Sequence, residues 1–600
     1  MKIKVSDYIV KKISEYTDYI FLVTGGGAMH LNDSIGQSQD IKYVCCHNEQ
    51  SCSIAAEAYA RVSGKIGAVN VTTGPGGINS LNGVFGAWVD SIPMIVISGQ
   101  VKRETCLSHY NLKGKLRQLG DQEVDIISMV NGITKYSVLV DNPLKIRFYL
   151  EEALYLALNG RPGPVWLDIP VDVQATYVEL DTLESFLIPD APIQIDDNVV
   201  EYIREAIIKL VSSERPIIYA GSGIWHSKSH SEFIEFAEKL NIPVVSAWNS
   251  NDLIWDDHSL YAGRPGSVGN RAGNFAVQNS DCLIVLGCRL NIRLVSYNWE
   301  NFAKNAFKIG VDIDLEELIK PTVNYDSKIN LDLKQFFRIA LKILNEEQIS
   351  FNIDSWGLKT KYWLSKYPIC LPEYWSLKDK VNPYCFIDSL FDNLSKDEII
   401  VCANGTACVT AFQGAKIKPG QRLFHNSGCA SMGYELPAAI GAYYSKGNSN
   451  RVICIAGDGS IMMNLQELET IVGNKLNIKI FLINNFGYQS IRQTQQSFFN
   501  NNVVGCGLDS GLSFPNFEKI SKAFDFQYFS IKNHLGMESI INECLSYDGP
   551  SICEIFVDLS QQFSPKLSSR KLDDGTMVTS SLEDMAPFLS REELKSNMYY

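Results

Sequence analysis

Short apolar runs alternate with amphipathic segments in three parts of the chain. In the first part, residues 19–23, 67–71 and 93–98 are apolar runs followed by glycine or polar residues, and residues 160–173 (GRPGPVWLDIPVDV) contain a last apolar run. Runs of this length, bounded by glycine and proline, favour buried strands. Their alternation with helical stretches is typical of βαβ units, so we expect a parallel sheet here.

The same pattern returns in two later parts of the chain. Each combines apolar runs with an amphipathic stretch, near 232–240 in the second part and ending at about 472 in the third. Such alternation again predicts strands joined by helices. The strands expected in these parts are 216–220, 243–246, 282–286 and 306–311, then 452–456 and 478–483.

Polar stretches separate the three parts, at 181–197 and at 345–382, and the residues from 564 onward show no clear period. A chain of 600 residues also exceeds what one hydrophobic core usually supports. We therefore predict an α/β protein with three doubly wound parallel-sheet domains. Their expected bounds are 1–180, 195–345 and 380–562, followed by a C-terminal tail at 563–600.

Composition narrows the class of protein. Hydrophobic residues make up 46% of the chain and charged residues 20%, and the formal net charge of −13 provides no basic surface for nucleic acid. No apolar stretch reaches the roughly 18 residues of a membrane span. We expect a cytoplasmic protein with no nucleic-acid or membrane partner. Its 15 cysteines contain no CxxC pair and are expected to be buried, reduced thiols.

One strand end carries a pattern suited to a phosphate and a cation. Residues 457–460 (GDGS) follow the run at 452–456, and Asn484 and Asn485 follow the run at 478–483. The glycines let backbone N–H groups approach a phosphate closely, while Asp458 and Asn485 offer oxygen ligands to Mg²⁺. One helix and one strand bring both side chains to the same sheet edge. An Asp-Gly pair alone would indicate only a turn.

This segment resembles the diphosphate-binding signature of thiamine-diphosphate enzymes. The resemblance implies two cofactors, thiamine diphosphate and Mg²⁺. It assigns the metal to Asp458, Asn485 and the backbone carbonyl of Gly487. The cofactor site that it implies in this part of the chain contains Gly457, Asp458, Gly459, Ser460, Asn485 and Gly487.

Further motifs are similar to those of the acetolactate synthase family. Residues 72–77 (TTGPGG), 86–100 (GAWVDSIPMIVISGQ) and 160–173 follow Glu49 in the order of that family. In the resemblance, Glu49 hydrogen-bonds the aminopyrimidine of the cofactor and activates it. A carboxyl group in an apolar cleft suits that task, because burial raises its pKa. Considered alone, Glu49 would be expected to cap the helix that follows it.

The resemblance implies three domains along the chain. The first binds the pyrimidine, the second is a central domain and the third binds the diphosphate. It places the active site between subunits, so we expect a homodimer or homotetramer that acts on small molecules. Considered alone, Met432 would be expected to fill the core and Arg293 to be a solvated surface residue. The family roles are cofactor binding for Thr73, Gly76 and Asn79, a wedge between the cofactor rings for Met432, a substrate-channel position for Gln122, and substrate contact for Gly27 and Arg293.

The central part has features of a nucleotide site. Gly221 and Gly223 form a turn after a strand, and Arg289, Asp312 and Asp314 lie near later strand ends. Glycine turns suit phosphates, and an acid suits a ribose hydroxyl. Related enzymes bind FAD in this domain, whereas others bind ADP or no nucleotide. FAD is therefore a candidate third cofactor.

Two positions depart from the acetolactate synthases of amino-acid pathways. Those enzymes carry a tryptophan nine residues after the metal-binding asparagine, where this chain has Thr494. Their Phe-Asp-Asp-Arg motif is replaced by residues 290–293 (LNIR). A hydroxyl in place of an indole opens space and adds a polar partner. In this respect the chain resembles the pyruvate-dependent carboligases of branched-sugar (yersiniose-type) biosynthesis.

The expected reaction is the decarboxylation of a 2-keto acid, pyruvate, and transfer of its two-carbon acyl unit to a 2-keto acid or a keto sugar. A simple decarboxylase would use the same cofactor residues. Family decarboxylases present paired histidines, whereas this chain has 8 histidines and no His-His pair. A nucleotide-binding homologue without activity is the other alternative. It is disfavoured because Glu49, Asp458 and Asn485 are all present.

Overall fold

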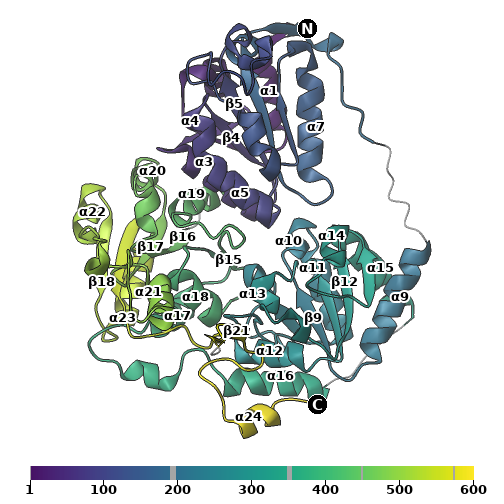
Figure 1. Ribbon diagram of the computed structural model, residues 1–600, viewed down its shortest axis with the longest axis vertical. Helices are drawn as coiled ribbons and strands as arrows, with labels where there is room; N and C mark the ends of the chain where they lie inside the picture. The colour runs from purple at the N-terminus through teal and green to yellow at the C-terminus, as the bar shows by residue number, and fades with distance from the viewer. Residues whose placement is uncertain (1, 190–196, 348–353, 447–450, 572–573, 600) are drawn as a thin grey trace.

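Three α/β domains follow one another along the chain in the computed structural model, which describes residues 2–189, 197–347, 354–446, 451–571 and 574–599. Figure 1 shows the N-terminal domain at the top, the central domain at the lower right and the C-terminal domain at the left. The linker expected at 181–197 and the domain start expected at 195 include residues 190–196, which lie outside the described residues. The polar stretch at 345–382 likewise includes 348–353.

The N-terminal sheet has six strands in the order β3-β2-β4-β5-β7-β6, and every pair is parallel. β4, β5 and β7 are buried along their whole length, which explains why most of their residues are apolar. The four strands expected here are confirmed as β2 (Tyr19–Leu22), β4 (Gly67–Val71), β5 (Met94–Gln100) and β7 (Pro164–Pro170). The sheet also contains β3 (Lys42–Cys45) and β6 (Tyr136–Leu139).

Helices cover both faces of this sheet. α1 (Val5–Ser14), α2 (Met29–Gln37) and α7 (Ile146–Leu158) bury apolar side chains against one face. α3 (Glu49–Ser63) and α5 (Leu81–Asp90) cover the other. The hydrophobic cluster on this second face continues into the C-terminal domain, so the two domains share one core.

The C-terminal sheet repeats the topology of the N-terminal one. Its six parallel strands run in the order β15-β14-β16-β17-β19-β18, and, numbered within each sheet, both orders read 2-1-3-4-6-5. The strands expected at 452–456 and 478–483 are confirmed as β16 and β17. The strands are β14 (Ile399–Cys402), β15 (Arg422–Phe424), β16 (Val452–Gly457), β17 (Ile478–Asn484), β18 (Gln527–Ile531) and β19 (Ser551–Phe556).

Two equivalent helices join these domains. α3 follows the second strand of the N-terminal sheet, and α19 (Glu435–Ser445) follows the second strand of the C-terminal sheet. The two helices pack against each other (Figure 1). A Cβ atom at Gly441 would lie 1.9 Å from the carbonyl oxygen of Ala55, so the helices are as close as their backbones permit.

The central sheet has five parallel strands in the order β10-β9-β11-β12-β13. The four strands expected here are confirmed, and β13 is an addition, because its exposed residues break the apolar pattern. The helix expected near 232–240 is α11 (His230–Leu240). The strands are β9 (Pro216–Ala220), β10 (Val244–Ser246), β11 (Cys282–Leu286), β12 (Phe307–Asp312) and β13 (Ser327–Asn330).

The chain after residue 563 has little regular structure. It contains an antiparallel pair, β20 (Ser569–Lys571) and β21 (Met577–Thr579), and the short helix α24 (Arg591–Ser596). It returns to the central domain, where the Asn279 side-chain amide donates a 2.9 Å hydrogen bond to the Asn597 carbonyl (Figure 1).

Two whole-chain features complete the fold. All cysteines are free, and all but three are buried, which confirms the expected core thiols for most of them. The described residues include no helix that is both long and apolar enough to cross a membrane.

Candidate functional site

A cavity of about 390 Å³ opens at the carboxyl edge of the C-terminal sheet. The strand order reverses between β14 and β16, and parallel sheets bind ligands at such a crevice. Segments that follow β14, β16 and β17 line the cavity, and one side chain comes from the central domain. The lining of this C-terminal cavity comprises residues 404–409, Ala430, Met432, 457–460, Ile483, Asn485, 487–491 and Arg293.

Three polar groups, a carboxylate, a side-chain amide and a backbone carbonyl, converge in the C-terminal cavity. The side-chain oxygen of Asn485 lies 2.5 Å from the Gly487 carbonyl oxygen and 3.2 Å from Asp458 Oδ1, and its amide nitrogen lies 3.0 Å from Thr406 Oγ1. Oxygens this close repel one another unless a cation lies between them or the amide turns over to present its nitrogen. Carboxylate, amide and carbonyl oxygens are the donor set of a hard cation such as Mg²⁺.

The Asp458 carboxylate is buried, with 1% of the residue exposed. It accepts hydrogen bonds from the backbone N–H groups of Gly487 at 3.0 Å and Gly459 at 2.9 Å. Burial raises the pKa of Asp458 to about 7, although these N–H groups act in the opposite direction. An adjacent cation would favour the charged carboxylate.

The GDGS turn is tied to the segment that carries Met432. Ser460 Oγ accepts a 2.9 Å hydrogen bond from the Gly433 N–H and donates a 2.8 Å bond to Glu435. Gly459 cannot be replaced by a larger residue, because a Cβ there would lie 2.2 Å from the Tyr488 ring. The turn and the Met432 segment therefore form one rigid wall of the cavity.

The carboxyl edge of the N-terminal sheet gathers the site residues expected in that domain. Asn79 Nδ2 donates a 3.0 Å hydrogen bond to Glu49 Oε2, and a Cβ at Gly76 would lie 3.4 Å from Glu49 Oε1. A Cβ at Gly27 would lie 1.9 Å from Thr73 Oγ1, so these two strand ends also touch. We call Gly27, Glu49, Thr73, Gly76, Asn79 and Gln122 the N-terminal cluster.

Gln122 joins the cluster through its backbone, because its carbonyl oxygen would lie 2.3 Å from a Cβ at Gly74. The cap of α3 is Asn48, whose side chain accepts a 2.8 Å hydrogen bond from the Gln50 N–H. Glu49 is therefore not the capping residue, and its partly exposed carboxylate faces Asn79. No residue of the N-terminal domain belongs to the described lining of the C-terminal cavity, whose lowest-numbered residue is Arg293. Within one chain, the N-terminal cluster is therefore separate from that cavity.

Two expected substrate residues lie at different places. Arg293 lines the C-terminal cavity, with its guanidinium carbon 5.3 Å from the centre of the Trp248 ring. Thr494 lies on the exposed side of α21 (Gln489–Phe498), where its hydroxyl donates a 3.0 Å bond to the Ser490 carbonyl. It is outside the cavity lining but three residues from Ile491, which is part of that lining.

The sequence interpretation missed several lining residues. Asn404, Thr406 and Ile491 were not assigned to the site. The signal for the first two was present, because Asn-Gly-Thr follows closely after the apolar run 399–402. That run is β14, on one side of the crevice.

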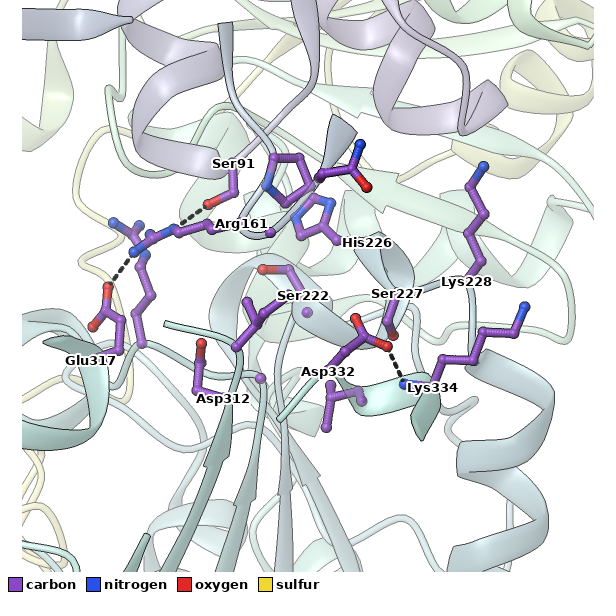
Figure 2. Close-up of a pocket in the computed structure, with 18 of the residues that line it drawn as sticks. Ser91, Arg161, Ser222, His226, Ser227, Lys228, Asp312, Glu317, Asp332 and Lys334 are labelled. Carbon is purple, nitrogen blue, oxygen red and sulfur yellow. Dashed lines mark hydrogen bonds and ion pairs between the residues drawn. The ribbon is translucent and has the colours of Figure 1, made fainter. Parts of the chain in front are cut away.

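A second cavity, of about 420 Å³, opens at the carboxyl edge of the central sheet. Figure 2 shows Ser91 and Arg161 of the N-terminal domain on its upper side, above Ser222 and Asp312 of the central domain. The strand order reverses here between β9 and β11. We call it the central cavity.

Only part of the expected nucleotide site lines the central cavity. Gly223, Arg289 and Asp312 belong to the lining. Gly221 packs instead on Gly287, whose carbonyl oxygen would lie 2.2 Å from a Cβ at Gly221. Asp314 forms a 2.8 Å ion pair with Arg161 Nη1. The lining residues missed from the sequence include Arg161, Lys228, Asp332 and Lys334, of which Arg161 lay in the quoted GRPGP motif.

The lining of the central cavity carries charges of both signs, a combination that suits an anionic ligand with hydroxyl groups. Arg161, Lys228 and Lys334 supply cationic groups, as Figure 2 shows. Burial raises the pKa of Asp312 to about 6 and, with repulsion from Arg61, lowers that of His226 to about 4. The buried Nε2 atom of His226 has no hydrogen-bond partner among the described residues. A ligand could therefore bond to it.

Comparison with known proteins gives the same three-part division. Family models match residues 3–129 (thiamine pyrophosphate enzyme, N-terminal TPP binding domain), 203–338 (central domain) and 403–555 (C-terminal TPP binding domain). An acetolactate synthase large subunit of Lactococcus lactis is 32% identical over 565 residues, 94% of each chain. One of Porphyra purpurea is 31% identical over 564 residues, 92% of this chain and 91% of that protein.

The acetolactate synthase isozyme 1 large subunit of Escherichia coli is 28% identical over 546 residues, which cover 90% of this chain and 92% of that protein. These matches extend over all three domains described above. The chain therefore belongs to the thiamine pyrophosphate enzyme family, as an acetolactate synthase-like enzyme that depends on thiamine diphosphate.

Proposed function

We propose that the enzyme decarboxylates pyruvate and transfers the remaining two-carbon acyl unit to a second carbonyl compound. The observation that carries this proposal is the convergence of the Asn485 side-chain amide, the Gly487 carbonyl and the Asp458 carboxylate in the C-terminal cavity. It supports Mg²⁺ and diphosphate binding at that edge. The names of the matched relatives, acetolactate synthases, support a 2-keto acid such as pyruvate as the donor.

The proposed roles follow from position and chemistry. When bound, thiamine diphosphate supplies a carbon nucleophile and accepts the electron pair released with CO₂. We assign Mg²⁺ to Asp458, Asn485 and the Gly487 carbonyl, with Gly457, Gly459 and Ser460 beside the diphosphate. Met432, 38% exposed in the single chain, is assigned to contact the thiamine rings.

Glu49 is assigned to hold a proton at the aminopyrimidine. Its hydrogen bond from Asn79 leaves Oε1 available for that contact. Gln122, in the same cluster, is assigned to the entering substrate. In these roles Glu49 moves a proton and Gln122 orients the substrate, while the metal site fixes the cofactor.

We further propose that two chains complete each active site. The N-terminal cluster carries the proposed acid, Glu49. The described lining of the C-terminal cavity contains no residue of the N-terminal domain of the same chain. A partner chain that places its Glu49 at this cavity would supply the missing half. The protein should then be at least a dimer in analytical ultracentrifugation, and an active monomer would contradict the proposal.

The proposed acceptor is a 2-keto acid or a keto sugar that is larger or more polar than pyruvate. Ile491 lines the C-terminal cavity, and Thr494, three residues on, shares that face of α21. An acceptor that extends beyond the cavity mouth would meet the Thr494 hydroxyl instead of an aromatic wall. Arg293 offers a guanidinium to a carboxylate or phosphate on the acceptor.

The central cavity is proposed to bind a nucleotide, with FAD as the first candidate. Its cations suit phosphates, and Asp312 and Asp332 suit ribose hydroxyls. Its volume of about 420 Å³ also lies within the common range for ligand pockets, about 300–1,000 Å³.

An acceptor screen tests the reaction. The holoenzyme with pyruvate and a panel of 2-keto acids and keto sugars should release CO₂ and yield acceptors heavier by a two-carbon acyl unit. Acetaldehyde as the sole product would favour a simple decarboxylase. No release of CO₂ would favour a nucleotide-binding homologue without activity.

A further inference from the structure

The three domains meet at Asp90, the last residue of α5. Its side chain is fully shielded from solvent. In the N-terminal domain, Arg61 Nη2 lies 2.9 Å from its Oδ2. Oδ1 accepts a 3.1 Å hydrogen bond from the Gly428 N–H of the C-terminal domain and lies 3.7 Å from Arg289 Nη2 of the central domain.

The central cavity borders on this carboxylate, and the C-terminal cavity is connected to it through a short segment. Asp90 and Arg289 line the central cavity. Gly428 begins segment 428–433, whose Met432 lines the C-terminal cavity. At its other end, this segment is bonded to the GDGS turn through the 2.9 Å bond from Gly433 to Ser460. Asp90, in the lining of the central cavity, thus holds one end of a segment that reaches the C-terminal cavity.

The contacts of Asp90 differ in tightness. A Cβ at Gly428 would lie 2.7 Å from Val89 Cγ2 and 2.8 Å from Asp90 Oδ1, so segment 428–433 rests directly on α5. The Arg289 side chain is 29% exposed, and its 3.7 Å separation from Asp90 is too long for a hydrogen bond. Arg289 is therefore the partner whose position a ligand can change.

We propose that Asp90 is a positioning residue that couples the central cavity to the C-terminal cavity. When an anionic group holds Arg289 in the central cavity, the Arg289 side chain has less freedom left to lose on pairing with Asp90. The pair therefore becomes stronger. The stronger pair holds Asp90, segment 428–433 and Met432 in place. Because binding linkage is reciprocal, thiamine diphosphate should strengthen binding in the central cavity by the same factor.

A double-mutant cycle tests this coupling without a ligand in the central cavity. Calorimetry would give the Kd of thiamine diphosphate with Mg²⁺ for the wild type, Arg289→Gln, Asp90→Asn and the double variant. Arg289→Gln should weaken binding about fivefold in the wild type, at the lower end of common couplings. It should have no further effect in Asp90→Asn. Equal losses in both backgrounds, or no loss in either, would overturn the proposal.

Asp252 provides a matched control. Its buried carboxylate also joins two domains, through Arg422 Nε at 2.7 Å and the Leu423 N–H at 3.3 Å, and it lines neither cavity. Asp252→Asn should leave the effect of Arg289→Gln unchanged. If Asp90→Asn does not fold, Gly428→Ala takes its place, because the added Cβ displaces segment 428–433 while the Arg61–Asp90 pair remains. The same loss of coupling is expected.

A titration with FAD tests the ligand side, which rests on the proposed nucleotide site. Flavin fluorescence should show about fivefold tighter binding when thiamine diphosphate and Mg²⁺ are present, and no such change in Asp90→Asn. Equal FAD affinity in both conditions for the wild type would contradict the coupling. If the wild type binds no FAD, the proposal of FAD fails, and the double-mutant cycle still decides whether Asp90 couples the cavities.

Discussion

The N-terminal and C-terminal domains have the same strand order, yet their carboxyl edges differ in chemistry. The N-terminal edge presents Glu49 with a hydrogen bond from Asn79. The C-terminal edge presents converging polar groups from Asp458, Asn485 and Gly487. One topology thus carries two chemically different edges, for which we propose proton handling and cation binding. The residues at the strand ends, rather than the fold, determine which is which.

The equivalent helices sharpen this comparison, because each begins with a glutamate. Glu49 opens α3 and is partly exposed. Glu435 opens α19 and is fully buried, with Oε2 bonded to Ser460 and Oε1 without a partner among the described residues. Burial raises the pKa of Glu435 to about 7. The first glutamate is placed to meet a ligand, and the second to support the wall of a cavity.

Glu49→Gln should remove the chemistry of the N-terminal edge alone. We expect the C2 proton of bound thiamine diphosphate to exchange about 10²–10⁴-fold more slowly, the usual contribution of a general acid or base. NMR in D₂O would measure the exchange rate. Affinity for thiamine diphosphate should stay close to that of the wild type. Unchanged exchange would remove Glu49 from its assigned role.

Asp458→Ala should remove the chemistry of the C-terminal edge. Affinity for thiamine diphosphate with Mg²⁺ should fall at least about 100-fold, because loss of groups behind metal ligands already costs about 10–100-fold. Calorimetry would measure it. Asp509→Ala, at an exposed pair with Arg492, is the control and should bind normally. Wild-type affinity in Asp458→Ala would refute the metal assignment.

Glu435→Gln tests whether the second glutamate is structural. The pKa of Glu435 in the folded state is about 7, above the ordinary value near 4.3. The free energy of unfolding of the wild type should therefore fall as the pH rises from about 4 to about 7, and level off above that. The variant should gain stability relative to the wild type over this window, by up to about 3 kcal/mol. Unfolding of both proteins at pH 5 and pH 8 would measure the difference. An equal difference at both pH values would contradict the account.

Thr494→Trp tests whether the mouth of the C-terminal cavity sets the acceptor. The indole should reduce transfer to a large acceptor about tenfold, the scale of a steric change in a pocket, while CO₂ release from pyruvate persists. Steady-state kinetics of both activities would measure it. Gln496→Trp, two residues along the same exposed helix, is the control and should change neither activity. Equal loss of both activities in Thr494→Trp would show that this position does not select the acceptor.

The buried strands could be predicted from the sequence, because β9 and β11 are apolar runs that are each followed by a glycine. β13 and β6 could not, since their partly exposed residues interrupt the pattern. The GDGS turn and Asn485 were identifiable because one βαβ unit brings them together. The Asp90 contacts were not, because they join residues 90, 289 and 428, which only the packing of three domains brings together.

The same limit explains Thr494, whose place relative to the cavity depends on the direction of α21. Gln493 and Gln495 illustrate the point. Both flank Thr494 in the sequence, but their side-chain amides bond to the Gln561 carbonyl and to Val504. Phe498 and Phe499, the next aromatic residues along the chain, are exposed.

Complementation between two inactive variants tests most directly whether the two edges form one site across chains. Glu49→Gln and Asp458→Ala chains, co-expressed with different tags, can be purified as the mixed dimer. One of its two sites then combines an intact Glu49 with an intact Asp458, so CO₂ release from pyruvate should recover to about half of the wild-type rate. A mixed dimer as inactive as its parents would place both edges of each site in one chain and contradict the account.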